Sequence, residues 1–483
     1  MRSIHYVPVV MVLVLLSFII SISACAPGSG AKTPQGDIDK FITQLEKSGF
    51  TVQKGSYGYQ DAIALCSAGL IDSCQGANVG APYLAYKLPP APGQTAPNMK
   101  IDPQDGLAFA YRLRSDEAIV QVGRTPPESA FYSYQSYLVF RYDPATGKYP
   151  PLFNSIGDSI NNLTINAVGD RFNEPVIFIS TADRGTDKMV RAAAQSAGYS
   201  SNIFNTDIIP SPVVKMGLEE GSDLFGFVSR IAVPKDRNEL DAYIKDPGST
   251  VLRLTPETPA VPDLFPVPTL RVRGTGKTEL GLMPDVEELR QAIMSRYGTL
   301  RAIEVPTYIA LPEGFSATQS KVNTMADDRE AAYFSTVEVD AWTKPGDSRR
   351  DAAFVMPDSP DDFIIIYGVN HEMTDKAMYA SCVIYGLQYL NGVAGVDSRE
   401  YRGSADDYIP GNPNAKYLYA WKIARQSRGD PHCLEVPTGP QRYGLGLDEK
   451  LIPFFRAYLE MSKKVGPANN ELVMDRVIVF SPK

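Results

Sequence analysis

The chain has few of the residues that most often carry chemistry in enzymes. Its 483 residues include three His, five Cys and two Trp. Three His leave little room for a histidine-based metal centre, and we expect neither a metal nor another cofactor. No two Cys have the Cys-x-x-Cys spacing of a zinc or redox site. Basic residues number 47 against 55 acidic ones, and the net charge of −8 excludes the broad basic surface that nucleic acid requires.

The overall composition is that of an ordinary folded protein. Hydrophobic residues make up 44% of the chain and charged residues 21%. The length is enough for two to four domains of roughly 100–200 residues each. These figures define a protein class without defining an activity.

The first 25 residues form a distinct segment. Arg2 is the only charged side chain before Lys32, and residues 9–22 are almost wholly apolar. This run is shorter than the roughly 20 residues that a spanning helix needs, which favours a signal peptide. It ends in Ile22-Ser23-Ala24-Cys25, which resembles the lipobox of bacterial-type lipoprotein precursors. The resemblance covers residues 1–25 only.

This resemblance implies that residues 1–24 are removed and that Cys25 becomes an acylated N-terminus. Fatty-acyl chains of the palmitate type would then hold the protein on a membrane of the cell envelope, facing the extracytoplasmic side. The alternative is an uncleaved membrane anchor, because the uncharged stretch reaches from Ser3 to Ala31. Both interpretations place the remaining residues outside the cytoplasm.

The other four Cys predict two disulfides. Cys66, Cys74, Cys382 and Cys433 are an even set, and an oxidising compartment favours pairing. Of three connectivities, Cys66–Cys74 with Cys382–Cys433 needs the fewest assumptions. Reduced, buried thiols are the alternative.

Proline and glycine divide the rest of the chain into segments. Five prolines between Pro256 and Pro268 predict a stiff connector, which is the main boundary. The expected segments are a tether (25–36), a region with a helix, the first Cys pair and a hairpin (37–125), a first α/β-type lobe (126–255), the connector (256–268) and a second α/β-type lobe (269–483).

Hydrophobic periodicity predicts individual elements within these segments. Strands at 175–180 and 203–209, joined by a helix over 186–197, favour a βαβ unit. Further predicted elements are helices after Asp37 and over 237–245, 285–297 and 448–461, strands at 129–142, 224–233, 363–367 and 477–480, and a hairpin formed by 107–113 and 118–122.

Two short matches suggest that the halves of the chain repeat one plan. Residues 128–133 resemble residues 330–335, and residues 176–188 align with residues 364–376 without a gap. The fold class is therefore α+β or α/β, with mixed sheets, flanking helices and two similar lobes if the repeat is real. The matches can also arise from common strand–helix patterns.

The candidate site residues lie in the loops that follow two predicted strands. The strand at 363–367 is followed by Asn370, His371 and Glu372. We consider His371 a candidate general base that the carboxylate of Glu372 would orient. The loop after 175–180 supplies Asp183 and Arg184, which we consider with Asn370 as ligand-binding residues. For all five, capping and structural hydrogen bonds are the competing interpretation.

Two familiar motifs are incomplete. Gly274-Thr275-Gly276-Lys277-Thr278 has the ending of a phosphate-binding loop, but Arg271 stands where the first glycine is required, so we reject a nucleotide site. No Gly-x-Ser-x-Gly elbow is present.

The sequence therefore favours a lipid-anchored envelope protein that binds a small molecule or another protein, with a cleft between two lobes as the expected place. A hydrolase that uses His371 with a nearby carboxylate is one alternative. A purely structural envelope protein is the other.

Overall fold

A computed structural model describes residues 36–483, except 70, 72, 75–76, 260, 339–340, 342–346, 349, 351–352 and 440–441. The predicted signal peptide, Cys25 and nearly all of the tether lie outside the described residues. Within the described part of the chain, no helix is long and apolar enough to cross a membrane.

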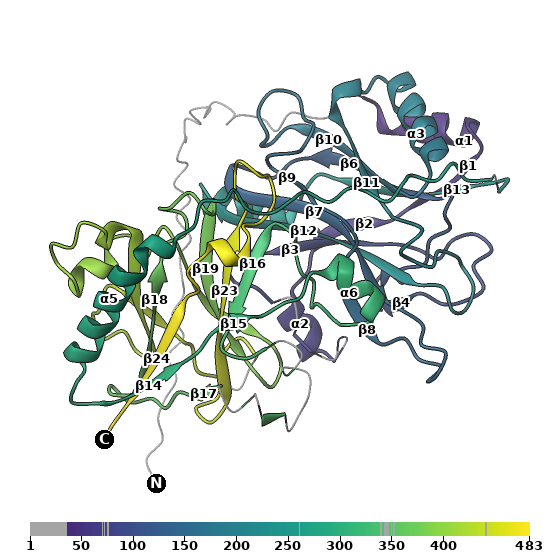
Figure 1. Ribbon diagram of the computed structural model, residues 1–483. Coiled ribbons are helices and arrows are strands. Elements are labelled where there is room, and N and C mark those ends of the chain that lie inside the picture. Colours follow the sequence, from purple (N-terminus) through teal and green to yellow (C-terminus); the bar gives the residue numbers. More distant parts are fainter. Residues whose placement is uncertain are drawn as a thin grey trace, which may run out of the picture.

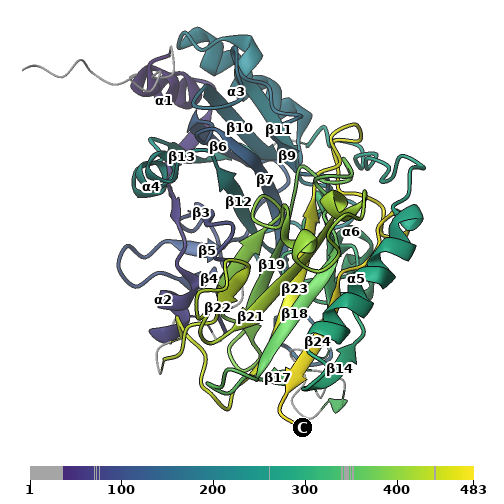
Figure 2. The ribbon, with the colours of Figure 1, turned by 90° about the vertical axis from the view of Figure 1, so that its left-hand side faces the viewer.

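The first lobe contains two sheets of largely antiparallel strands (Figures 1 and 2). Its outer sheet has the order β1 (Phe50–Lys54), β13 (Thr250–Pro256), β6 (Ala118–Arg124), β10 (Pro175–Thr181) and β11 (Phe204–Ile208). Its inner sheet has the order β2 (Ser56–Tyr59), β3 (Tyr83–Lys87), β12 (Leu224–Pro234), β7 (Ser129–Phe140) and β8 (Pro151–Ser155), with β9 (Ile160–Asn161) beside β7. A small separate sheet pairs β4 (Met99–Ile101) with β5 (Ala108–Ala110).

The second lobe has the same two-sheet plan. Its outer sheet has the order β14 (Arg301–Val305), β24 (Arg476–Ser481), β18 (Phe363–Val369), β21 (Leu418–Ala424) and β22 (Cys433–Glu435). Its inner sheet has the order β15 (Tyr308–Ile309), β16 (Ala331–Ser335), β23 (Lys450–Tyr458), β19 (Tyr379–Gly386) and β20 (Gly392–Asp397), with β17 (Phe354–Val355) beside β23.

The two lobes repeat one topology along the main path of each sheet, and β4, β5, β9 and β17 lie outside this repeat. In both outer sheets the last pair is parallel, β10–β11 and β21–β22, and the other pairs are antiparallel. The α+β class and the two similar lobes are thus confirmed. The sequence matches behind the predicted repeat are nevertheless out of register, because they align β7 with β16, and β10 with β18. In the common topology β7 corresponds to β19, and β10 to β21.

Helices cover the two outer sheets, and the two inner sheets face each other in the middle of the molecule. The helices α1 (Ile38–Lys47) and α3 (Arg184–Ser196) pack on the first outer sheet, and α5 (Met283–Arg296) packs on the second (Figure 1). Phe131 of β7 contacts Tyr379 of β19 and Tyr458 of β23 across the inner sheets. Among the described residues, an apolar core rather than an open cleft joins the lobes at the contacts of Phe131.

Several element predictions agree with the structure, and the agreement is closest where the local signal is strong. The βαβ unit is present as β10, α3 and β11, and α4 spans Arg237–Lys245 as expected. Asp37 caps α1 by accepting hydrogen bonds from the amides of Asp39 and Lys40. The remaining short helical turns are η1 (Ser201–Ile203), η2 (Leu280–Leu282), η4 (Ser404–Asp407), η5 (Ala415–Tyr417) and η6 (Asn469–Glu471).

The predicted boundary at residue 126 and the hairpin before it are wrong. β1, β2, β3 and β6 all come from the 37–125 segment, yet they are strands of the two first-lobe sheets. The segment cannot be a separate unit, because β1, β3 and β6 pair with strands in 175–256. The hairpin fails because Tyr111 bridges to Phe225 of β12, whereas β6 pairs with β10 and β13.

The predicted helix over 448–461 is also wrong, because this segment is the central strand β23 of the second inner sheet. Pro453 is compatible with that place. Phe454 is the last residue opposite β16, and Leu451 is the first opposite β17, so Pro453 falls in the gap between these two partners. On its other side Pro453 lies opposite Ile384 of β19, so the missing amide hydrogen costs little only on the side of the gap.

Each lobe sends an arm onto the other. The first arm, residues 60–82, carries α2 (Ala62–Ser67), and its Cys74 amide donates to the carbonyl of Tyr389 in the second lobe (2.8 Å). The second arm, residues 310–330, carries α6 (Gly314–Ser320), and its Asp327 accepts a hydrogen bond from the amide of Ser155 in the first lobe (2.9 Å). These reciprocal contacts join the lobes in addition to the apolar core.

One of the two predicted disulfides is present. Cys66 and Cys74 are bonded within the first arm. Cys382 and Cys433 are free thiols, so their predicted pairing is wrong. Cys382 lies in the core between the two second-lobe sheets, whereas Cys433 packs in the core that covers the other side of the outer sheet. The sheet itself separates the two sulfur atoms.

Candidate functional site

His371 lies in the turn after β18 and is enclosed by the second lobe. Its side chain is 2% exposed. The imidazole Nδ1 is 2.9 Å from both carboxylate oxygens of Glu279, and Nε2 is 3.8 Å from Oδ2 of Asp475. Burial lowers the pKa of His371, but the two carboxylates outweigh it and raise the pKa to about 10. His371 is thus a buried imidazolium at neutral pH, and a proton held this firmly is unsuited to general-base work.

Glu279 has a full set of partners besides His371. It accepts hydrogen bonds from the Thr374 hydroxyl (2.6 Å) and from the Val473 amide (2.9 Å). Burial raises the pKa of Glu279, and His371 with these donors outweighs it, so the pKa is lowered. The ion pair of Glu279 and His371 therefore links the start of the second lobe to the turn after β18.

The glycine-containing loop at 274–277 binds a carboxylate of its own chain. The amides of Gly276 and Thr275 donate to the two oxygens of Glu471 (2.6 and 3.0 Å), and the Lys376 ammonium also contacts Glu471. Burial raises the pKa of Glu471, but the Lys376 ammonium and the two amides outweigh it and lower the pKa to about 2. The anion-binding geometry of this loop is thus used within the fold.

Asn370 and Glu372, which the sequence also predicts as site residues, stabilise the turn that contains His371. Asn370 donates to the carbonyl of Ser398 (2.8 Å) and accepts from the amide of Glu372 (3.2 Å). Glu372 accepts from the Ser398 hydroxyl (2.7 Å) and pairs with Arg402. None of these contacts joins Glu372 to the imidazole.

Asp183 and Arg184 hold the proline-rich connector against the first lobe. Asp183 is the N-cap of α3, where it accepts from the amide of Thr186 (2.8 Å), and it also accepts from the amide of Asp263 (2.6 Å). Arg184 pairs with the Asp263 carboxylate. The structure therefore does not bring Asp183 and Arg184 into one site with His371.

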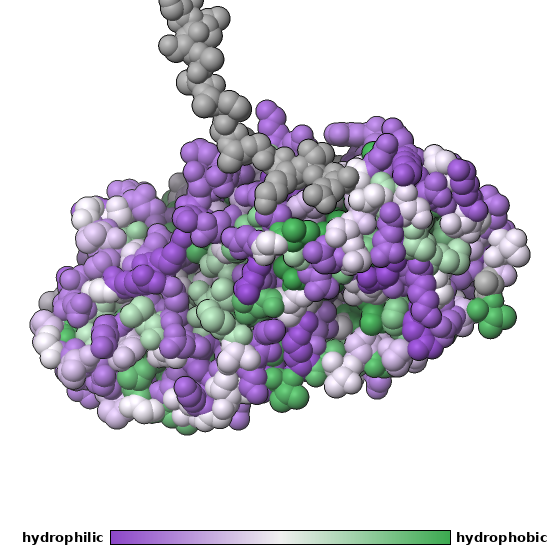
Figure 3. All heavy atoms as spheres, turned by 90° about the horizontal axis from the view of Figure 1, so that it is seen from above, coloured by the Kyte–Doolittle hydropathy of each residue, from purple (hydrophilic) through white to green (hydrophobic). Residues whose placement is uncertain are grey.

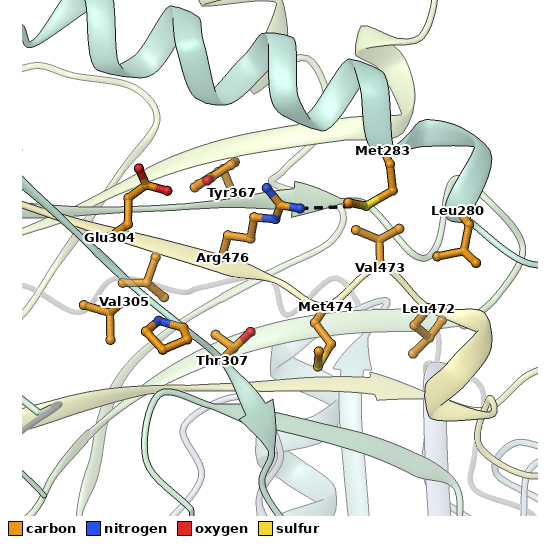
Figure 4. A pocket seen from close by; sticks show the side chains of 12 residues that line it. Leu280, Met283, Glu304, Val305, Thr307, Tyr367, Leu472, Val473, Met474 and Arg476 are labelled. Carbon is orange, nitrogen blue, oxygen red and sulfur yellow. Dashed lines mark hydrogen bonds between the residues drawn. The ribbon is translucent and has the colours of Figure 1, made fainter. Parts of the chain in front are cut away.

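A groove of about 490 Å³ opens beside the His371 network, at the start of β24 (Figure 4). We call it the apolar groove. Most of its wall is hydrophobic, and four separate chain segments build it. Its lining residues are Leu280, Met283, Glu304, Val305, Pro306, Thr307, Tyr367, Leu472, Val473, Met474, Arg476 and Val477.

The connection between β23 and β24 provides much of this wall. In the first lobe, the equivalent connection forms α4, which packs Leu240 and Tyr243 into the core. In the second lobe, its described residues fold into no α-helix, and Leu472, Val473 and Met474 line the groove instead. Met474 remains 40% exposed, and Leu280, which also lines the groove, 54%.

Arg476 is the cation of the groove. Its guanidinium lies 3.8 Å from the Met283 sulfur and 3.9 Å from a Glu287 oxygen (Figure 4). The neighbouring Glu304 is held by Arg290, with Nε at 2.8 Å from Oε2. Arg290 neutralises Glu304, and Arg476 also interacts with the Tyr367 hydroxyl. Among the described residues, the one carboxylate that pairs with Arg476 is Glu287 at 3.9 Å, so the guanidinium can still donate to an anionic group of a ligand.

A second hollow of about 640 Å³ lies where the first arm meets the second lobe. We call it the junction pocket. Its wall combines residues 79–80 of the first arm with β20, Arg425 and residues 434–438. Arg425 donates to backbone carbonyls, among them those of Met356 (2.9 Å) and Gly446 (2.8 Å).

The surface seen from above is mostly hydrophilic, with hydrophobic areas between the polar ones (Figure 3).

Sequence reasoning missed Glu279 and Arg476. Glu279 is 92 residues from His371, and Arg476 is a single charge before an apolar strand. No local pattern marks either residue. Among the described residues, no group of three or more His, Cys, Asp or Glu is arranged to hold a metal ion.

Comparisons with known proteins give no functional assignment. No family model matches the chain, and no curated relative matches it. Among solved structures, the chain is similar to a putative uncharacterized protein from Burkholderia cenocepacia, with a TM-score of 0.40, 10% identity and coverage of 92% of this chain and 87% of that one. It is also similar to the VPA0106 protein from Vibrio parahaemolyticus, with a TM-score of 0.36, 11% identity and coverage of 78% and 88%. Neither similarity carries an argument about function.

Proposed function

We propose that the protein is an extracytoplasmic lipoprotein, anchored through lipid on Cys25, that binds an amphiphilic anion in the apolar groove. The ligand would have an apolar chain and a carboxylate or similar group. The observation that carries this proposal is Arg476, a cation whose carboxylate partner among the described residues, Glu287, is 3.9 Å away, in a wall that is otherwise mostly apolar.

Different residues of the groove would bind the two parts of the ligand. Leu280, Met283 and Met474 offer exposed apolar surface to the chain of the ligand, and burial of such surface contributes roughly 25 cal/mol per Å². Methionine side chains are flexible and adapt to ligands of different shape. Arg476 fixes the orientation by pairing with the anionic end.

The hydrolase alternative has no comparable support. His371 is enclosed and ion-paired, and Glu372 is bonded to Ser398 and Arg402. The structural alternative predicts that the groove takes no ligand, which makes it an outcome of the same experiment.

Photolabelling of the full chain tests the proposal. Membranes containing the protein are treated with a hexadecanoate that carries a diazirine on its chain, and the labelled peptides are identified by mass spectrometry. We expect labels in the peptides that contain Met283 and Met474. Labelling that avoids both peptides, or is spread evenly over the surface, contradicts binding in the groove and favours the structural alternative.

A further inference from the structure

Two buried arginines stand at equivalent positions in the two lobes. Arg230 of β12 lies opposite Tyr83 of β3 and Ser133 of β7. Arg456 of β23 lies opposite Tyr333 of β16 and Ser381 of β19 in the same way. Both arginines occur where the inner sheets face each other, and they are 1% and 7% exposed.

The neighbouring tyrosines are equivalent as well. Tyr137 lies four residues after Ser133, and its hydroxyl accepts a hydrogen bond from Arg230 (2.6 Å). Tyr385 lies four residues after Ser381, and its hydroxyl accepts one from Arg456 (2.8 Å). The repeat therefore extends from the topology to individual hydrogen bonds.

The carboxylate that neutralises Arg230 comes from the second arm. Asp328 Oδ2 is 3.1 Å from the guanidinium, and both side chains are fully enclosed. Asp328 also accepts a hydrogen bond from the amide two residues later, that of Glu330 (3.0 Å). It precedes Tyr333 by five residues.

The equivalent residue in the first arm is Asn78. It precedes Tyr83 by five residues, and its Oδ1 accepts from the amide of Gly80 (3.0 Å) in the same local turn. The backbone bond that follows is repeated too, from Ala81 to Asn78 (3.1 Å) and from Ala331 to Asp328 (2.9 Å). Position 78 thus has the geometry of position 328 with a neutral amide in place of the carboxylate.

Arg456 consequently lacks the partner that Arg230 has. Among the described residues, its Nη1 has no hydrogen-bond acceptor. Its surroundings are aromatic, with Phe454 at 4.4 Å and Tyr385 at 5.5 Å from the guanidinium carbon to the ring centres. A buried arginine without a counter-charge is costly, so this position favours an anion.

The field around Tyr83 agrees with that geometry. Burial raises the pKa of Tyr83, but Arg230 and Arg456 outweigh it, and the Asn78 side chain adds a hydrogen bond, so the pKa is lowered. Arg230, Arg456 and Asn78 therefore all stabilise the ionised form of the Tyr83 hydroxyl.

The junction pocket begins at the residue that follows Asn78. Its wall includes Val79 and Gly80, which directly follow Asn78. The equivalent residues of the second arm are Arg329 and Glu330, large side chains that pair with Asp158 of the first lobe and with Arg271, respectively. The first arm thus has a valine and a glycine where the second arm has two large charged residues.

We propose that Arg456 and Asn78 form a binding site for a small carboxylate, held where position 78 lacks the carboxylate that Asp328 supplies in the other half. The ligand carboxylate accepts hydrogen bonds from Arg456 and from the Asn78 amide group. This site is separate from the apolar groove and does not depend on the proposed function.

Titration of the full chain in detergent with ¹³C-labelled acetate tests the site. The NMR signal of acetate is followed at constant ionic strength, with chloride as the replaced anion. We expect saturable binding, and a melting temperature that rises by about 2–4 °C at saturation. Absence of saturable binding overturns the proposal, whatever the variants do.

The variant Asn78→Asp places a carboxylate in the site and keeps the acceptor of the Gly80 turn. We expect it to lower the affinity for acetate by about tenfold or more, because an internal carboxylate competes at high effective concentration. Asn202→Asp, at an exposed position in η1, is the matched control and should leave acetate binding unchanged. Equal acetate affinity in the Asn78→Asp variant and the unaltered chain overturns the location.

Discussion

The imidazolium of His371 donates to both carboxylate oxygens of Glu279 at 2.9 Å inside the second lobe. Replacing His371 by Gln leaves the Glu279 carboxylate buried without its cation. We expect a loss of about 3–5 kcal/mol in the free energy of unfolding, the usual cost of breaking a buried pair. Urea unfolding followed by circular dichroism measures it.

The control for this variant is His432→Gln. His432 also pairs with a carboxylate, that of Asp407 at 2.9 Å, but that carboxylate is about half exposed. Surface pairs contribute about 0–1 kcal/mol, so this variant should unfold almost like the unaltered chain. Equal losses in the two variants contradict a structural role for His371.

The stability difference between the unaltered chain and the His371→Gln variant should depend on pH in a definite direction. The folded pKa of about 10 is above the unfolded value of 6.5, so the folded state binds the proton more tightly. The contribution of His371 is fully present below pH 6.5 and is lost as the pH rises toward 10. At the acid end, the lowered pKa of Glu279 means that its contribution is lost as the pH falls below the usual carboxyl range. A difference that grows between pH 7 and pH 10 contradicts the pairing.

Thiol counting tests the disulfide pattern. In denaturant without reductant, Cys382 and Cys433 should react with Ellman's reagent, while Cys66 and Cys74 should not. In the folded chain Cys433 should react slowly, because burial raises its pKa to about 11, and Cys382 should be protected by the core. Finding no reactive thiol after denaturation means that the second disulfide forms after all.

Lipid anchoring has its own test. Cys25→Ser removes the sulfur that would carry the acyl group, and the protein should leave the membrane fraction on cell fractionation. Cys433→Ser makes the same exchange elsewhere and should leave the distribution unchanged. Retention of the Cys25→Ser variant in the membrane fraction favours the uncleaved anchor.

Local signals identified elements well where one period or one cap dominates. The helix α4 and the unit β10–α3–β11 have clear starts and stops, and they occur at the expected residues. The strand β23 failed for a physical reason. All of Leu451–Tyr458 are buried, since the strand lies between two apolar cores, and a segment buried on both faces shows no alternation that distinguishes a strand from a helix.

The repeat was detectable, but its register was not. Short matches such as residues 128–133 and 330–335 reflect strands with similar surroundings, and many strand pairs share those. The equivalent residues of the two lobes are isolated in the sequence. The Arg230–Tyr137 hydrogen bond, for example, corresponds to the Arg456–Tyr385 hydrogen bond. A single arginine in an apolar strand becomes informative only when the strand opposite it is known.

The residues of the candidate site could largely not be predicted from the sequence. In the sequence, Asn370 and Glu372 beside His371 make it a candidate, yet the partners of its imidazole come from elsewhere in the chain. The apolar groove is assembled from residues between 280 and 477, and its wall exists because the β23–β24 connection has no counterpart of α4. Such a site depends on tertiary packing and leaves no mark in any one segment.

The proposed function is tested most directly by the preference of the groove for a charged ligand. The diazirine-labelled hexadecanoate and the uncharged alcohol of the same chain are compared in the unaltered protein, in Arg476→Met and in Arg237→Met, which alters an exposed arginine paired with Asp241. We expect the groove peptides to take more acid than alcohol in the unaltered protein and in Arg237→Met, and to lose that preference in Arg476→Met. An acid-to-alcohol ratio that is the same in all three proteins contradicts anion recognition by Arg476.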